Sequence, residues 1–140
     1  MSKRAGAALA RVPLFAGLSA RHLRRVAELC EEQRYMEGAT IVRAGDAGDA
    51  FFVILEGEAK VVAPTGRTLN RLFPGDVFGE ISLLDGGPRT ASVIAETPIT
   101  VLALPRRAFL GLLEAEPVVA GRVLRNVAGP VRRHERSLTA

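Results

Sequence analysis

The sequence predicts a mainly β protein of the α+β class, in which helices flank an antiparallel β-roll or jelly roll. Two observations carry this prediction. Over residues 37–104, short runs of β-forming residues alternate with turn residues about every 8–12 positions, a pattern typical of sandwiches and barrels. On both sides of that region, apolar residues recur at helical spacing. A chain of 140 residues is expected to form one domain with a substantial core.

N-terminal helices are expected over residues 1–36. Ser19 is a favourable N-cap, and the apolar residues behind it fall at helical spacing. Leu14, Phe15 and Leu18 predict a shorter apolar turn that packs beside this helix. A turn at residues 37–38 is expected to end the helical region.

The single cysteine, Cys30, cannot form an internal disulfide bond. Its apolar helical setting predicts a buried, inert thiol rather than a nucleophile. This cysteine usage is typical of a reducing compartment, so a cytoplasmic location is expected. No apolar run approaches the ~20 residues that a membrane span requires, so no membrane span is expected.

The β-roll is expected over residues 37–104. Its predicted strands cover residues 40–43, 50–55, 59–63, 68–72, 92–95 and 100–103. The run at 50–55 is apolar on both faces, which predicts a central strand.

Two C-terminal helices are expected over residues 105–140, where Pro105 and Pro117 suit first helical turns. The pair Gly129-Pro130 should bend the last helix. Its apolar stripe can pack on the chain's own roll or form a dimer seam; its members are Ala120, Leu124, Val127, Val131 and Leu138.

Charge is distributed unevenly along the chain. Residues 1–34 carry a net charge of +4, residues 35–120 carry −4, and residues 121–140 carry +4. The basic ends are consistent with solvated helix faces. They are also consistent with a docking surface for an acidic partner, a membrane face or nucleic acid.

Residues 75–92, GDVFGEISLLDGGPRTAS, carry the strongest functional signal. Glu80 stands at a predicted helix start, whose free N–H groups attract phosphate. Arg89 follows a Gly-Gly-Pro bend and can add a charge-assisted pair to the same phosphate. Glu80 would be repelled by a phosphate but can accept from a sugar hydroxyl. The combination predicts a nucleotide site. A loop salt bridge between the two residues is the alternative, but exposed ion pairs contribute little and would not require the glycines on both sides.

The same segment resembles the phosphate-binding cassette of cyclic nucleotide-binding domains, such as catabolite-activator-like and protein kinase A regulatory-subunit-like sensors. The matching residues are Gly75, Asp76, Gly79, Glu80, Ser82, Leu83, Pro88, Arg89, Thr90, Ala91 and Ser92. Flanking matches fall in the family's order over residues 13–19, 45–57 and 109–117, so the resemblance covers nearly the whole chain.

The resemblance implies a role for each cassette residue. Glu80 would accept from the ribose 2′-hydroxyl, and Arg89 would pair with the cyclic phosphate. The backbone N–H groups that would complete the phosphate site belong to Gly79, Ile81, Ser82, Thr90 and Ala91. A hydroxyl at Thr90 is compatible with cGMP and with cAMP, and it can equally cap the following strand. The nucleotide therefore stays open at this point, with cAMP favoured.

The base requires an apolar wall and a lid. Wall candidates, for each of which core packing is an equal alternative, are Val61, Val62, Leu72 and Val77. In the family the lid comes from the last helix, which here offers Val127, Val131 and Arg132. The break at Gly129-Pro130 departs from the family's usual unbroken helix.

Catalysis and metal binding are not expected. The two histidines, His22 and His134, lie in the helical ends, so neither a cupin-type metal site nor a catalytic triad can be assembled. No cofactor is expected besides the ligand, cAMP or cGMP. The chain ends at Ala140, before the helix-turn-helix that follows this domain in the family's regulators. We therefore expect a stand-alone sensor that binds no specific DNA by itself.

The expected function is binding of a cyclic mononucleotide, cAMP over cGMP. Movement of the C-terminal and N-terminal helices would relay its presence to an unidentified protein partner, for which a second copy of the chain is a candidate. The alternative is a protein-interaction domain that keeps the fold and acts without a nucleotide.

Overall fold

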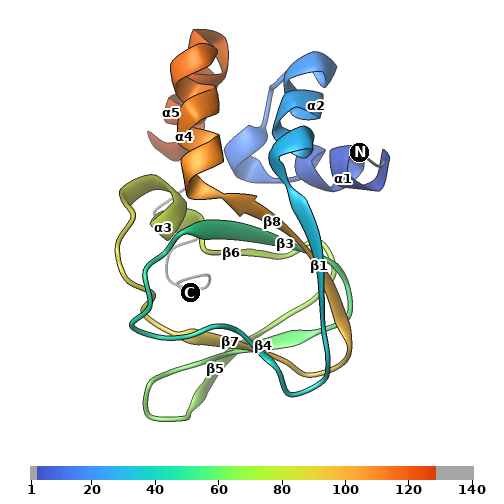
Figure 1. Ribbon diagram of the computed structural model, residues 1–140, viewed down its shortest axis with the longest axis vertical. Helices are drawn as coiled ribbons and strands as arrows, with labels where there is room; N and C mark the ends of the chain where they lie inside the picture. Colours follow the sequence, from blue (N-terminus) through green and yellow to red (C-terminus); the bar gives the residue numbers. More distant parts are fainter. Residues whose placement is uncertain (1–2, 129–140) are drawn as a thin grey trace.

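Within residues 3–128, which the computed structural model describes, two four-stranded antiparallel sheets face each other and helices gather at one end (Figure 1). One sheet has the order β1-β8-β3-β6 and the other β2-β7-β4-β5. The strands are β1 (Glu31–Tyr35), β2 (Thr40–Val42), β3 (Ala50–Glu56), β4 (Ala59–Val62), β5 (Thr68–Leu72), β6 (Val77–Phe78), β7 (Ser92–Ala95) and β8 (Ile99–Pro105). The helices are α1 (Lys3–Ala10), the 3-10 turn η1 (Pro13–Phe15), α2 (Ala20–Leu29), α3 (Glu80–Asp85), α4 (Arg106–Ala115) and α5 (Pro117–Ala128). The predicted β-roll with flanking helices is confirmed.

The central strand is β3, which pairs with β8 on one side and β6 on the other. Its side chains alternate between two cores, as expected for a strand buried on both faces. Phe51 and Val53 face the helices, whereas Phe52 and Ile54 face the interior of the roll. The prediction that the apolar run at residues 50–55 is central is therefore confirmed.

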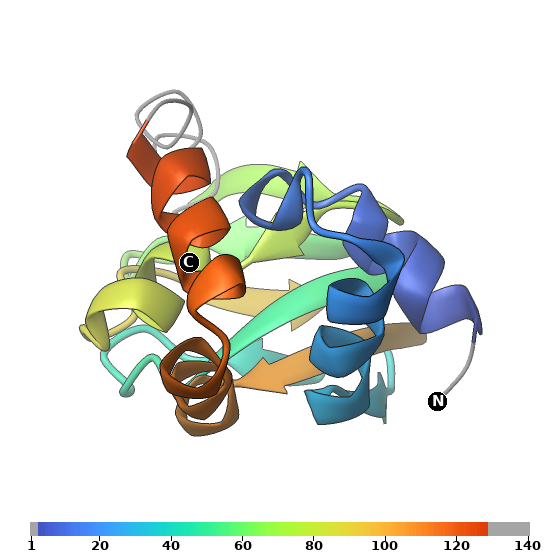
Figure 2. The ribbon, with the colours of Figure 1, turned by 90° about the horizontal axis from the view of Figure 1, so that it is seen from above.

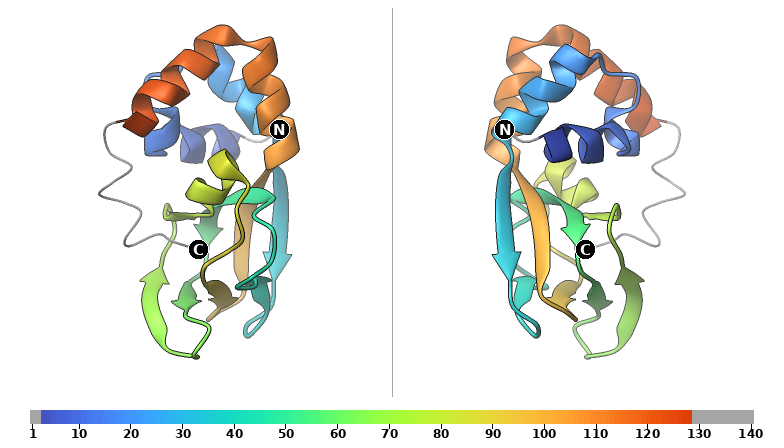
Figure 3. Two further views of the ribbon diagram at one scale, coloured as in Figure 1. Left: turned by 90° about the vertical axis from the view of Figure 1, so that its left-hand side faces the viewer. Right: turned by 90° about the vertical axis from the view of Figure 1, so that its right-hand side faces the viewer.

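Two hydrophobic clusters hold these layers together. The helical core lies between β3, β6, β8 and the helices; among its members are Leu9, Phe15, Val26, Phe51, Val53, Val77, Leu102, Leu104, Phe109, Val119 and Val123. The roll core lies between the two sheets; among its members are Phe52, Ile54, Val61, Leu72, Phe78, Ala91, Val93 and Val101. Views at right angles show the same division into a helical end and a roll (Figure 3).

Aromatic contacts join three segments in the helical core. The ring of Phe15 lies edge-on to Phe51 and to Phe109, with centroid separations of 6.1 and 5.9 Å. Such contacts contribute about 0.5–1.5 kcal/mol each beyond the burial of area. The N-terminal turn, the central strand and α4 therefore pack as one unit, and seen from above the helices lie together over the sheet (Figure 2).

The start of the second helix agrees with the prediction and its end does not. Ser19 is the N-cap, and its Oγ accepts from the His22 amide at 3.2 Å. The helix ends at Leu29, however, and Glu31–Tyr35 form strand β1 instead of continuing the helical region. This strand pairs with β8 at the edge of its sheet, where its mainly exposed polar side chains carry no apolar alternation. The helical assignment of residues 31–36 was therefore wrong, because pairing with β8 decides the conformation.

Helix α5 begins at Pro117, as predicted, but it buries a different face from the one expected. Val119 and Val123 are buried, whereas Leu124 is 72% exposed. The amide of Asn126 donates to the carbonyls of Leu14 and Ala16, at 2.9 Å each, and so sets the rotation of the helix. Packing of Leu124 on the chain's own roll was therefore a wrong prediction. The predicted bend at 129–130 and the stripe residues Val131 and Leu138 lie outside the described residues.

Cys30 lies in the helical core and is 5% exposed. Burial raises the pKa of its thiol to about 12, which keeps it protonated and unreactive. The prediction of a buried, inert thiol is confirmed. None of the described helices has the length and apolar character needed to cross a bilayer.

Candidate functional site

The short helix of the cassette, α3, lies between two glycines in the left-handed region. Gly79 is its N-cap with φ +84°, and Gly86 is its C-cap with φ +70°. The Gly86 amide donates to the Ser82 carbonyl at 2.8 Å and closes the last turn. Side chains are disfavoured at both positions, so the two glycines define where the helix begins and ends. Glu80 is its first residue, in accord with the predicted helix start.

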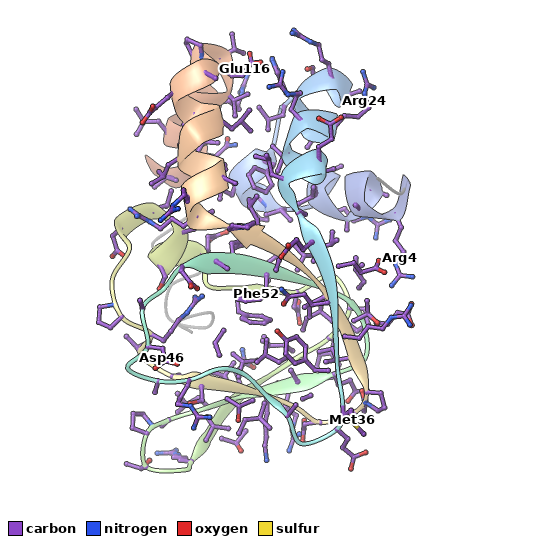
Figure 4. All side chains as sticks on the ribbon, in the orientation of Figure 1. Arg4, Arg24, Met36, Asp46, Phe52 and Glu116 are labelled. Atoms are coloured by element: carbon purple, nitrogen blue, oxygen red, sulfur yellow. The ribbon has the colours of Figure 1, made fainter. Side chains whose placement is uncertain are left out.

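Arg89 is buried and directed toward the roll. Its side chain is 4% exposed, and Nη2 donates to the Ala50 carbonyl at 2.6 Å. The guanidinium carbon lies 5.8 Å from the ring centroid of Phe52, whose ring lies between the two sheets (Figure 4). Burial lowers the pKa of Arg89 and the charge of Asp49 opposes that effect, yet an arginine stays protonated. The site therefore holds a cation inside the protein.

The structure brings Arg89 to the start of α3. A β-carbon built on Gly79 would lie 2.5 Å from Arg89 Nη1, so the guanidinium rests against the N-cap glycine. Glu80, at 8% exposed, is buried at the same end of the helix. A cation and the first amides of a helix thus occupy one place, which is the arrangement that suits an anion.

The loop at residues 45–48 holds the backbone around Arg89 by hydrogen bonds. The Gly45 amide donates to the Arg89 carbonyl, and the Arg89 amide donates to the Asp46 carbonyl, both at 2.8 Å. The Gly48 amide donates to the Gly87 carbonyl at 3.1 Å. These bonds fix the backbone on both sides of Arg89, so the guanidinium is positioned by residues more than 40 positions away in the sequence.

The other predicted cassette residues follow α3 and the bend. Ile81 is the second residue of α3, and Ser82 is buried. Thr90 is exposed, and Ala91 is buried in the roll core. Thr90 therefore lies at the surface of the cassette, whereas Ala91 anchors its end in the roll core.

The predicted base contacts separate into two groups. Val61 and Leu72 belong to the roll core, and Val62 is 9% exposed. Val77 belongs to the helical core, because successive residues of β6 face opposite ways and Phe78 is the one that faces the roll. Its assignment to the wall of the roll was therefore wrong.

The predicted lid residues lie elsewhere or beyond the described part. Val127 packs against the helical core rather than the roll core. Val131 and Arg132 lie outside the described residues.

Three contributors to the site were not identified from the sequence: the charge of Asp49, the carbonyl of Ala50 and the ring of Phe52. All three lie in the segment 45–57, where the family's glycine-rich pattern was recognised but no role was assigned. No local signal marks a backbone carbonyl as a partner, so only the fold could identify Ala50. Among residues 3–128, no group of three or more His, Cys, Asp or Glu side chains is placed to hold a metal ion.

Comparison with known proteins adds a family match. The model of the cyclic nucleotide-binding domain matches residues 32–116, which is more than half of the chain. A crystal structure of the N-terminal domain of a transcriptional regulator from Streptomyces coelicolor superposes with a TM-score of 0.82 at 36% identity, covering 91% of this chain and 92% of that one.

Three curated proteins are similar over most of this chain. A cAMP-dependent protein kinase regulatory subunit of Colletotrichum orbiculare is 38% identical over 106 residues, which are 75% of this chain and 27% of that protein. The cGMP-dependent protein kinase egl-4 of Caenorhabditis briggsae is 38% identical over 111 residues, 75% of this chain and 15% of that protein. Glutaminase 1 of Bradyrhizobium diazoefficiens is 37% identical over 120 residues, 86% of this chain and 19% of that protein. The chain thus spans less than a third of the length of each.

Proposed function

The chain belongs to the cyclic nucleotide-binding domain family, and from that premise we propose that its cassette binds a cyclic mononucleotide, cAMP in preference to cGMP. The observation that carries this proposal is the buried guanidinium of Arg89 against the N-cap glycine of α3. Arg89 pairs with the cyclic phosphate, and the first amides of α3 complete its binding.

Glu80 binds the ribose. Its carboxylate accepts from the 2′-hydroxyl, since a carboxylate has no favourable contact with a phosphate. It is buried at the same helix start as Arg89, which is consistent with two adjacent groups of one ligand.

The choice between cAMP and cGMP is a separate question from phosphate binding. The relatives include a regulatory subunit named for cAMP and a kinase named for cGMP, at the same identity. Thr90 is exposed, and a hydroxyl at this position is compatible with either base. Calorimetry with both nucleotides decides between them.

The base lies on Val61 and Leu72 in this proposal, and the last helix supplies the lid. Val127 packs on the helical core, so α5 has to change position before Val127 reaches the base. Val131 and Arg132 are the other lid candidates. A ligand that binds the closed arrangement more tightly shifts the population toward it.

The output is a movement of α4 and α5 that a protein partner or a second copy of the chain detects. The proposed role is sensing rather than catalysis, because the match to the glutaminase covers only 19% of that enzyme. A nucleotide-independent interaction domain is the second candidate. It is favoured by Val118 and Leu124, which expose 67% and 72% of their surface on α5.

Calorimetry with cAMP and cGMP tests the proposal on the wild type, Arg89→Ala and Arg67→Ala. Loss of a buried charge that pairs with the ligand should weaken binding by about 2–5 kcal/mol. Arg67 is exposed in the turn between β4 and β5, so its replacement controls for the loss of one positive charge. No heat from the wild type at millimolar nucleotide would refute nucleotide binding and leave the interaction domain.

The role of Glu80 has its own test, in which Glu80→Gln and the wild type are each titrated with cAMP and with 2′-deoxy-cAMP. If Glu80 binds the 2′-hydroxyl, the variant loses affinity for cAMP and much less for the deoxy analogue. Equal losses for both ligands would place Glu80 away from the ribose.

A further inference from the structure

Arg106, the first residue of α4, bonds to the far end of the cassette helix. Its Nε donates to the Leu83 carbonyl at 3.0 Å, and its Nη2 donates to the Leu84 carbonyl at 3.3 Å. These carbonyls belong to the last turn of α3, where intrahelical bonds leave acceptors unsatisfied. A cation at this end is also favoured by the helix dipole. A side chain of α4 therefore caps the C-terminal end of α3.

The fit around this guanidinium is close. A β-carbon built on Gly86 would lie 2.9 Å from Arg106 Cζ, so the guanidinium packs against the C-cap glycine. The backbone amide of Arg106 also donates to the Asp49 carbonyl at 2.8 Å. The next carbonyl along the chain, that of Ala50, is the one that accepts from Arg89.

Arg106 thus bonds to two segments near the phosphate-binding arginine, the last turn of α3 and the Asp49 carbonyl immediately before β3. Arg106 is the first residue of α4, and the same helix places Phe109 in the helical core against Phe15. A displacement of α3 would therefore disturb the two hydrogen bonds that join its last turn to the first residue of α4.

We propose that Arg106 is a positioning residue that couples the position of the cassette helix α3 to α4 and, through α4, to α5. For its ligand this inference rests on the proposed function. The neighbouring Arg107 is exposed and provides a matched control of the same charge on the same helix.

A residue that only capped α3 would affect stability and affinity, but at saturating ligand the helices would still move. A coupling residue changes the movement itself. The decisive measurement is therefore the displacement of α5 at saturation, where differences in affinity no longer contribute.

Spin labels at Met36→Cys and Leu124→Cys report that displacement. Met36 is 80% exposed in the turn at the end of the roll distant from the helices (Figure 4). Leu124 is exposed on α5. The buried thiol of Cys30 is protected from labelling. The distance between labels is measured by pulsed electron paramagnetic resonance, with and without saturating cAMP, in four backgrounds: wild type, Arg106→Ala, Arg106→Lys and Arg107→Ala.

We expect wild type and Arg107→Ala to shift on ligand addition, Arg106→Ala to bind cAMP but lose most of the shift, and Arg106→Lys to recover part of it. A lysine can bond one carbonyl but cannot reproduce the fork. A full shift in Arg106→Ala at saturation would overturn the proposal. If the wild type binds neither cAMP nor cGMP in calorimetry, the proposed function fails, and an experiment without ligand decides the coupling.

That experiment is amide hydrogen exchange on the ligand-free protein. In the wild type, α3 and the first turn of α4 should open together as one unit. Arg106→Ala removes two bonds from a charged donor, so α3 amides should exchange about tenfold or more faster and independently of α4. Arg107→Ala should leave both segments unchanged. Unchanged exchange of α3 in Arg106→Ala would overturn the coupling whether or not a nucleotide binds.

Discussion

The guanidinium of Arg89 rests against the α-carbon of Gly79, the N-cap of α3. A β-carbon at Gly79 would stand 2.5 Å from Arg89 Nη1 and 2.8 Å from the Ala50 carbonyl oxygen. The glycine therefore serves two purposes, a left-handed backbone and room for the arginine. The absence of a side chain at residue 79 is what allows a buried cation to lie at the start of the helix.

Replacement of this glycine should disturb the site as well as the backbone. Gly79→Ala should lower both the free energy of unfolding and the affinity for cAMP, because Arg89 has to move. The control is Gly66→Ala, where φ is +93° but no atom lies within 4 Å of the added carbon. Both variants carry the left-handed cost of about 1–2 kcal/mol. Chemical denaturation and calorimetry compare them, and similar losses of affinity would contradict the argument.

At residue 48 a glycine is required by lack of space for a side chain, although its backbone angle φ is not in the left-handed region. A β-carbon there would overlap the Ser82 side chain and lie 2.7 Å from the Gly87 carbonyl oxygen. Gly48→Ala should therefore destabilise the domain by about 1–3 kcal/mol. Gly111→Ala on α4, where nothing lies within 4 Å, should instead stabilise it by about 0.5–1 kcal/mol. Urea unfolding measures both, and a neutral Gly48→Ala would show that the two loops are not tightly packed.

Asn126 fastens α5 to the N-terminal turn. Its side-chain amide donates to the carbonyls of Leu14 and Ala16, so Asn126→Ala should cost about 1–3 kcal/mol in the free energy of unfolding. Leu124→Ala, two residues earlier on the exposed face, should change it by less than about 0.5 kcal/mol. Thermal and urea unfolding provide the comparison. A larger effect at Leu124 would mean that this face is covered in solution.

The burial of Cys30 makes the free energy of unfolding depend on pH in the alkaline range. Burial raises the pKa of its thiol from 9.0 to about 12, so the unfolded chain loses this proton first. The stabilisation that the buried, protonated thiol contributes is complete below pH 9 and is lost as the pH rises from 9 toward 12. The free energy of unfolding should fall more steeply over this range in the wild type than in Cys30→Ala. Parallel curves for the two proteins would contradict the buried, protonated thiol.

Local signals were sufficient for several elements. Ser19 capped the second helix as predicted, and Pro117 began the last one, because caps and first turns depend on a few adjacent residues. The pattern of residues 50–55 identified the central strand, because burial on both faces is visible as an unbroken apolar run.

The wrong predictions share a cause, because in each case a contact with a distant segment of the chain decides the conformation or the buried face. Glu31–Tyr35 form a strand only because β8 offers a partner, and their polar side chains do not mark them. Val77 faces the helical core because β6 pairs with β3 in one particular register. Leu124 is exposed because Asn126 fixes the rotation of α5.

The sequence by itself determined the class of fold, the family and the segment that carries the cassette, because these depend on periodicity and on glycine, acid and arginine at fixed spacing. Only the tertiary structure decided where the arginine goes. The carbonyls that hold Arg89 belong to Asp46, in the loop before β3, and to Ala50, the first residue of β3, and Arg106 reaches α3 from the following helix. Backbone carbonyls look the same at every position of a sequence, so a site built on them becomes visible only once the chain has folded.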